Sequence, residues 1–252
     1  MNETTVRDMS IVIPVYNEAE NIEPMVREIQ AAFEGRAESW EAIFVDDASS
    51  DDSAAILQAL SLSVFEKGVV RCLRHRRNFG QSAAVATGFG CARGEWIGTL
   101  DGDGQNDPAD LPRMLDEARR AGVDCVTGVR AKRQDNFIRR LSSRIANGFR
   151  NWATGDRVSD SGCGVRVVRA ACVGELPVFN GLHRFMPTLL RAKGFTVAET
   201  PVNHRPRLAG VSKYGVHNRL WRGIRDCFGV RWFKARAVPA VRLGDEGARE
   251  TR

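Results

Sequence analysis

Two carboxylates separated by a single glycine, Asp101 and Asp103, follow directly after an apolar run at residues 96–100. This run has the length and composition of a buried strand, so the pair lies where a strand opens into a loop. Paired carboxylate oxygens at such a point suit Mg²⁺ or Mn²⁺, cations that proteins commonly share with a substrate diphosphate. Surface loops also contain isolated Asp-x-Asp pairs, but this position favours chemistry on a nucleotide-activated substrate.

The elements that would position this pair alternate along the first half of the chain. Apolar and β-branched runs predict strands at residues 10–15, 41–45, 68–73, 96–100 and 124–129. Helical spacing predicts helices between them, at residues 17–33, 54–60, 78–91 and 108–121. The helix at 78–91 is rich in small residues and can pack closely on a sheet. This alternation predicts an α/β fold with a mostly parallel central sheet.

The second half is less regular. Its patterns predict a basic amphipathic helix at 135–152, a strand at 165–168, a helix at 184–193, a strand at 196–202 and an amphipathic helix at 217–232. We therefore divide the chain into a polar N-terminal tail at 1–9, a main domain at 10–214, an amphipathic helical extension at 215–238 and a disordered tail at 239–252.

Polar residues gather at the predicted carboxyl ends of the strands, the edge where parallel sheets bind ligands. The candidates at this edge are Pro14, Tyr16, Glu18, Asp46, Asp47, Asp101, Asp103 and Arg130. Asp46 and Asp47 alone would more often form a turn and a helix cap. The convergence of these residues therefore carries more weight than any one of them.

Composition limits the class and the compartment of the protein. The chain has 252 residues, of which 43% are hydrophobic and 27% charged, enough for a globular domain with a substantial core. No run reaches the roughly 20 apolar residues of a membrane-spanning helix, and the first nine residues lack the apolar stretch of a signal peptide. We expect a cytosolic protein whose six scattered cysteines are reduced and mostly buried.

The net charge of +6 is distributed unevenly. Seven Lys or Arg and one acid lie between residues 130 and 150, and a second basic stretch at 205–236 is interleaved with aromatic residues. Such stretches bind nucleic acid, an anionic membrane surface or a phosphate-rich substrate, while charge alone favours a solvated face. A nucleic-acid-binding protein would leave the acidic pair unexplained, so we expect no nucleic acid partner.

Three motifs in this order resemble family 2 glycosyltransferases of the GT-A fold. They are Ile13-Pro14-Val15-Tyr16-Asn17-Glu18, Val45-Asp46-Asp47-Ala48-Ser49-Ser50-Asp51 and Asp101-Gly102-Asp103. More narrowly, the segment at 101–108 resembles the DxDxQxxP pattern of dolichyl- and polyprenyl-phosphate sugar transferases, as do Arg205-Pro206-Arg207 and Gly210-Val211-Ser212-Lys213-Tyr214. The similarity extends from about residue 10 to about residue 232. It implies a metal-dependent, inverting transfer of a sugar from a GDP- or UDP-linked donor to a polyprenyl phosphate at the cytoplasmic membrane face.

The resemblance also implies roles for individual residues. It assigns the nucleotide sugar to Pro14, Tyr16, Glu18, Asp46, Asp101, Gly102, Asp103, Arg207 and Lys213. It assigns Mg²⁺ or Mn²⁺ to Asp101, Asp103 and Gln105, and the lipid phosphate to Arg130, Arg139 and Ser143. The expected catalytic residues are Asp103, Arg130, Arg207 and Lys213, the last two closing over the donor diphosphate from a loop.

These roles have a physical basis. Negative charge builds on the diphosphate as the sugar–nucleotide bond breaks, and a cation with two basic side chains stabilises it there. A phosphate monoester acceptor is already charged near neutral pH, so it needs positioning more than a general base. His183 and Arg184 can line the sugar site, and Asp160 can orient the acceptor or form a structural turn.

Two other functions fit the same motifs. A family 2 transferase can instead act on a saccharide or lipid A-like hydroxyl, a reaction that needs a general base. A non-catalytic subunit that binds a nucleotide sugar is the other. Since the chain has no spanning segment, we expect a peripheral association with the membrane through its basic, aromatic helices, or through a membrane partner protein.

Overall fold

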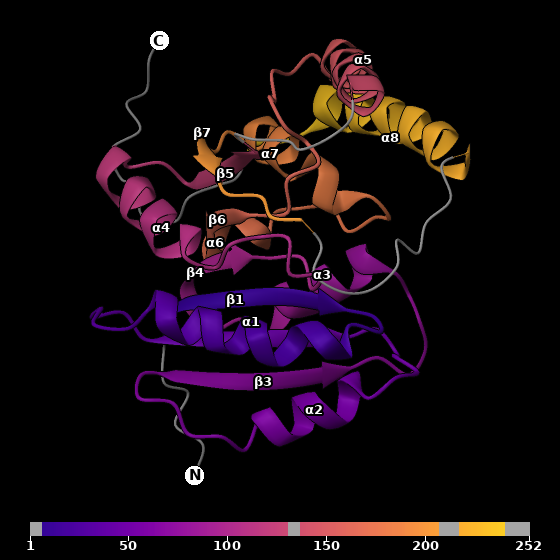
Figure 1. Cartoon of the computed structure of the whole chain (residues 1–252). Coiled ribbons are helices and arrows are strands. Elements are labelled where there is room, and N and C mark those ends of the chain that lie inside the picture. Colours follow the sequence, from indigo (N-terminus) through magenta and orange to yellow (C-terminus); the bar gives the residue numbers. More distant parts are fainter. Residues whose placement is uncertain (1–6, 131–136, 207–216, 240–252) are drawn as a thin grey trace.

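The computed structural model describes residues 7–130, 137–206 and 217–239, with side chains described from residue 146 onward in the fifth helix and from residue 223 onward in the last (Figure 1). A seven-stranded sheet runs through the middle, with strand order β3-β2-β1-β4-β6-β5-β7. The strands are β1 (Arg7–Val15), β2 (Trp40–Asp46), β3 (Gly68–Arg74), β4 (Gly94–Thr99), β5 (Cys125–Arg130), β6 (Arg166–Arg169) and β7 (Val197–Val202).

The helices follow the predicted alternation. They are α1 (Ala19–Ala32), α2 (Ser53–Leu60), α3 (Gln81–Cys91), α4 (Asp110–Ala121), α5 (Phe137–Thr154), α6 (Ala170–Val173), α7 (Leu182–Ala192) and α8 (His217–Arg236). The four-residue α6 was not predicted. β1 begins earlier than expected because Arg7 pairs with Gly94, so residues 7–9 belong to the sheet and not to a polar tail.

One strand runs against the others. β1, β2, β3 and β4 are mutually parallel, as are β5 and β7, whereas β6 lies between β4 and β5 and is antiparallel to both. The sheet is thus mostly parallel, as predicted. Because β6 is reversed, its amino end lies at the edge where β4 and β5 have their carboxyl ends. The loop that leads into β6 therefore reaches the same edge as the acidic pair.

Helices cover both faces of the sheet, which leaves its central strands buried on both sides. Alternate residues of β1 show this: Ile11 and Ile13 pack in one core with residues of α1 and α4, and Val12 packs in another with residues of α7 and α8. α3 lies close to the sheet, because a Cβ on Gly88 would overlap the Val12 side chain. The expected close packing of this small-residue helix is confirmed.

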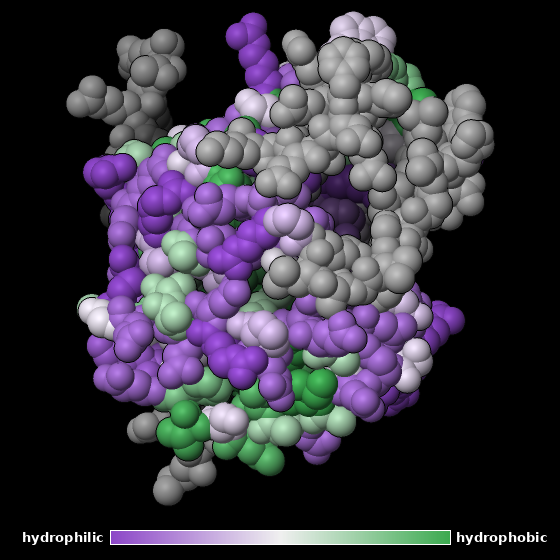
Figure 2. Space-filling view, in the orientation of Figure 1, coloured by the Kyte–Doolittle hydropathy of each residue, from purple (hydrophilic) through white to green (hydrophobic). Residues whose placement is uncertain are grey.

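α5 and α8 pack against each other at one end of the molecule, at the upper right of Figure 1. The helix expected at 217–232 is present and extends to Arg236. Trp152, Phe228 and Trp232 on these two helices are 69%, 51% and 65% exposed. In the view of Figure 2, hydrophilic residues make up most of the coloured surface of the molecule. Within the described residues, no helix is both long enough and apolar enough to span a membrane.

Candidate active site

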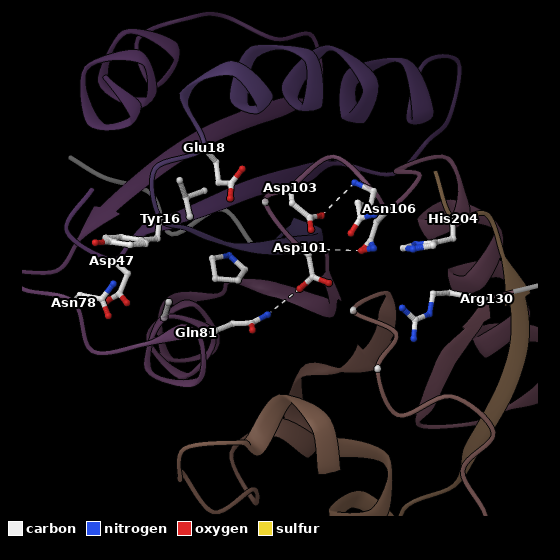
Figure 3. Close-up of a pocket in the computed structure, with 17 residues that line it drawn as sticks. Tyr16, Glu18, Asp47, Asn78, Gln81, Asp101, Asp103, Asn106, Arg130 and His204 are labelled. Atoms are coloured by element: carbon white, nitrogen blue, oxygen red, sulfur yellow. Dashed lines mark hydrogen bonds between the residues drawn. The ribbon is translucent and has the colours of Figure 1, made fainter. Parts of the chain in front are cut away.

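A cavity of about 380 Å³ lies at the carboxyl edge of the parallel strands (Figure 3). Eight of the residues to which the resemblance assigns a role line it, namely Pro14, Tyr16, Glu18, Asp101, Gly102, Asp103, Gln105 and Arg130. They come from the ends of β1, β4 and β5 and the loops that follow. The strand-end convergence expected from the sequence is therefore present as one cavity.

The acidic pair lies in the middle of this cavity. The Asp101 carboxylate accepts a hydrogen bond from Gln81 Nε2 at 2.9 Å, and Asp103 Oδ1 accepts one from the Gln105 backbone N–H at 3.2 Å (Figure 3). Burial, and then the negative charge of Asp103, raise the pKa of Asp101 to about 6. The pair thus concentrates negative charge where water is largely excluded.

This donor set fits a hard divalent cation. A dication would relieve the repulsion between the Asp101 and Asp103 carboxylates, and the Gln105 side chain borders the same space. Among the described residues there is no group of three or more His, Cys, Asp or Glu that could hold a metal ion. Further ligands would therefore come from a substrate diphosphate or water, as is usual for Mg²⁺.

The loop before β6 packs against this pair. A Cβ on Gly164 would overlap the Asp101 carboxylate, so only glycine fits at this position. Thr99 Oγ1, at the end of β4, donates to the Gly164 carbonyl at 2.6 Å and holds the loop in place. The sequence contains no signal for this contact, because it depends on β6 lying beside β4.

Arg130 is held in a fixed orientation by Asp160. Arg130 Nε and Nη2 donate to the two oxygens of Asp160 at 2.7 and 2.8 Å, a bidentate geometry. The two side chains are 15% and 10% exposed, so the pair is largely desolvated. Asp160 therefore orients a cavity arginine, a role that was not predicted, and its Oδ1 also accepts the Gly162 backbone N–H at 3.2 Å within a turn. Orientation of the acceptor by Asp160 stays a prediction.

Asp47, rather than Asp46, reaches the cavity. Asp46 is fully buried, accepts a hydrogen bond from Ser49 N–H at 2.9 Å and lies 3.2 Å from Arg74 Nε. Asp47 accepts hydrogen bonds from the backbone N–H groups of Phe79 and Gly80 at 2.9 and 2.7 Å. Successive residues at a strand end point to opposite sides, so Asp47 lines the cavity and Asp46 does not. The assignment of the nucleotide to Asp46 stays a prediction.

Several other lining residues were not predicted. They are Asn78, Gln81, Asn106, Gly162, Gly164 and His204. Asn78 and Gln81 follow the strand at 68–74, so extending the strand-end rule to this third strand would have identified them. His204 reaches the cavity because its backbone forms an antiparallel bridge with Asn106.

Four predicted residues lie outside the described part of the site. Arg139 and Ser143 belong to α5, but their side chains are not among the described residues, and Arg207 and Lys213 lie outside the described residues altogether. Their assignments remain predictions.

Comparison with known proteins gives a consistent result. Residues 10–169 match the family model for glycosyl transferase family 2. The chain is 36% identical over 244 residues to the dodecaprenyl-phosphate galacturonate synthase of Rhizobium johnstonii, covering 95% of this chain and 71% of that protein. It is also 36% identical over 212 residues to the undecaprenyl-phosphate 4-deoxy-4-formamido-L-arabinose transferase of Edwardsiella ictaluri, covering 84% of this chain but 64% of that protein.

Solved structures show the same fold. The glucosyl-3-phosphoglycerate synthase of Mycobacterium tuberculosis, in complex with Mn²⁺, UDP and glucosyl-3-phosphoglycerate, aligns with a TM-score of 0.60 at 16% identity, over 93% of this chain and 82% of that one. The mannosyltransferase PcManGT of Pyrobaculum calidifontis, in complex with GDP-Man and Mn²⁺, aligns with a TM-score of 0.62 at 19% identity, over 96% and 68%. The expected GT-A architecture is confirmed.

Proposed function

The chain belongs to glycosyl transferase family 2, and we propose that it transfers a sugar from a nucleotide sugar to a polyprenyl phosphate with the help of Mg²⁺ or Mn²⁺. The observation that carries the proposal is the acidic pair Asp101 and Asp103 in one cavity with the oriented guanidinium of Arg130. This arrangement supports the proposal because a cation held by the acidic pair would lie beside a basic group, as transfer between two phosphate-bearing substrates requires. The names of the two relatives support a polyprenyl phosphate acceptor.

Asp101, Asp103 and Gln105 would hold the metal ion, which neutralises negative charge on the leaving diphosphate. The nucleoside would lie toward Tyr16, Asp47 and Asn78, which line the part of the cavity formed after β1, β2 and β3. Arg207 and Lys213, which lie outside the described residues, would add positive charge to the diphosphate.

Arg130 would bind the acceptor phosphate together with Arg139 and Ser143. Asp160 positions its guanidinium before the acceptor arrives, which lowers the cost of ordering it in the reaction. An acceptor phosphate oxygen then forms a bond to the anomeric carbon while the bond from that carbon to the donor diphosphate breaks. The bonding electrons leave with the diphosphate, and a single in-line displacement inverts the configuration.

The exposed aromatic residues of α5 and α8 would place the protein at the membrane surface that holds a lipid acceptor. Trp152, Phe228 and Trp232 are exposed beside arginines, and the guanidinium carbon of Arg236 lies 5.8 Å from the centre of the Trp232 ring. Aromatic and basic side chains together favour the interface of an anionic membrane. We propose a peripheral association at the cytoplasmic face, either direct or through a membrane partner protein.

A donor panel with undecaprenyl phosphate, Mg²⁺ or Mn²⁺ and detergent tests the transfer, with sugar extracted into the lipid phase as the readout. We expect product with at least one donor and its loss in Asp103→Asn, which keeps the shape of the side chain but removes the charge. Asp52→Asn is the matched control, because Asp52 is exposed and its side chain makes no helix-capping hydrogen bond. Metal-dependent nucleotide binding without product from any donor would refute the lipid phosphate acceptor.

A further inference from the structure

A second, smaller cavity of about 180 Å³ adjoins the first on the side of α7. The two cavities share the Asp101 side chain and the glycines that precede β6. Ser161, Arg166, His183 and Arg184 contribute polar groups to the second cavity alone. Since ligand pockets for larger molecules span roughly 300–1,000 Å³, this space suits one small ring next to the diphosphate site.

Arg166 is a buried arginine of the second cavity with one unused hydrogen-bond donor among the described residues. Arg166 is 3% exposed and lies in the middle of the sheet, where it pairs with Thr99 and Thr127 in the strand register. Its Nε is buried without a hydrogen-bond partner among these residues. The carboxylate that balances the Arg166 charge in this cavity is that of Asp101, whose pKa Arg166 helps to lower. A metal ion bound by Asp101 would take up that negative charge, so an anionic occupant would restore the balance at Arg166.

His183 lines the same space, and one of its tautomers offers a hydrogen-bond donor there. Ser82 Oγ accepts the Gly181 backbone N–H at 2.8 Å and lies 2.9 Å from His183 Nδ1. The Ser82 hydroxyl can accept a second hydrogen bond or donate its own proton, and in one of the two histidine tautomers it donates that proton to Nδ1. In that tautomer the ring proton is carried by Nε2.

Apart from Asp101, the charged side chains that line this cavity are both arginines. Its described lining contains two arginines and a histidine, and its single carboxylate, Asp101, belongs to the proposed metal site and already accepts a hydrogen bond from Gln81. Sugar hydroxyls both donate and accept, whereas a carboxylate only accepts and pairs well with guanidinium groups. The balance of groups favours a carboxylate on the ring that occupies this space.

We propose that the donor sugar is a hexuronic acid whose carboxylate is bound by Arg166 and Arg184 in the second cavity. This inference rests on the proposed function, since it names the sugar of the same transfer. The acceptor phosphate is another source of negative charge that two arginines would bind. The experiment below separates the two sources.

The test compares donors that differ only in this carboxylate: UDP-glucuronate with UDP-glucose, UDP-galacturonate with UDP-galactose, and GDP-mannuronate with GDP-mannose. The readout is kcat/KM for transfer to undecaprenyl phosphate, with KM for the acceptor measured alongside. We expect wild type to prefer one uronate over its neutral partner. Arg184→Gln should lower that preference about 10- to 100-fold, as loss of hydrogen bonds to a charged group does, and Arg184→Lys should lower it less. Arg120→Gln is the control, because it removes the same charge from an exposed position on α4.

Each outcome has one meaning. A preference of wild type for a neutral sugar overturns the inference but leaves the proposed function intact. If Arg184→Gln lowers kcat/KM equally with all donors and raises KM for undecaprenyl phosphate, the cavity binds the acceptor phosphate. This result also overturns the inference. If wild type transfers no sugar, the proposed function fails, and calorimetric binding of the same donor pairs with Mn²⁺ still tests the cavity: equal affinity for uronate and neutral sugar would refute the carboxylate site.

Discussion

Gly164→Ala is a perturbation whose effect on catalysis can be worked out from one contact. A Cβ at this position would lie 2.6 Å from Asp101 Cγ and 2.9 Å from Oδ1, and closer still to Oδ2. Ordinary contacts between such atoms begin near about 3.5 Å, so the carboxylate would have to move by about 1 Å. The move breaks or strains the 2.9 Å hydrogen bond from Gln81.

A displacement of about 1 Å in a positioning group typically lowers the rate about 100-fold, which equals about 2.7 kcal/mol in the activation barrier. We therefore expect Gly164→Ala to lower kcat for lipid-linked sugar formation by about this factor. Its affinity for Mn²⁺, measured by calorimetry in the presence of nucleotide, should fall as well, because the same carboxylate would hold the metal ion.

Gly90→Ala is the matched control. Gly90 lies on α3, and a Cβ there would have no atom within 4 Å, so the change should leave kcat unaltered and stabilise the helix slightly. Melting curves of both variants separate misplacement of Asp101 from unfolding. A folded Gly164→Ala protein with the kcat and the Mn²⁺ affinity of wild type would show that the position of Asp101 does not govern the reaction.

Three further predictions concern groups whose environment only the fold establishes. Burial lowers the pKa of Arg150 to about 10, and its guanidinium nitrogens have no hydrogen-bond partner among the described residues. Arg150→Met should therefore stabilise the protein by about 1–3 kcal/mol, measured in a thermal melt. A Tm below that of wild type would contradict this reasoning. Asp160→Ala should cost about 3 kcal/mol in urea unfolding, because it leaves Arg130 without its largely buried partner; a loss below about 1 kcal/mol would count against that pair. Burial raises the pKa of Cys125 to about 12 and that of Cys163 to about 11. At pH 8, therefore, no more than roughly one thiol in a thousand is ionised. Neither cysteine should react with iodoacetamide before the protein unfolds, which mass spectrometry of the labelled protein would show.

Much of the fold was predictable because it depends on local patterns. The alternation of strands and helices follows from hydrophobic periodicity, and the observed elements begin and end within a few residues of their expected positions. The short α6 and the early start of β1 were missed, since both depend on neighbouring strands. All six cysteines are free and four of them are buried, so the expectation of reduced and mostly buried thiols agrees with the fold.

The sequence by itself determined the central chemistry of the site. Asp101 and Asp103 are two residues apart after a strand, and Tyr16 and Glu18 follow another strand, so the rule that ligands bind at the carboxyl edge brings them together without knowledge of the strand order. All four line the cavity. Residues this close together in the sequence are positioned by the direction of the strand that precedes them, so their placement does not depend on the order of the strands in the sheet.

Tertiary structure alone decided which distant groups complete the site. The position of β6 between β4 and β5 brings Asp160 to Arg130 and Gly164 to Asp101, and the packing of α7 on α3 brings His183 to Ser82. The choice of Asp47 over Asp46 depends on which side of the sheet a single residue faces. Most of these contacts join residues that are far apart in the chain, and local periodicity carries no information about the order of strands in the sheet. The difference between Asp46 and Asp47 depends on a shift of one residue at a strand end, which local periodicity does not fix either.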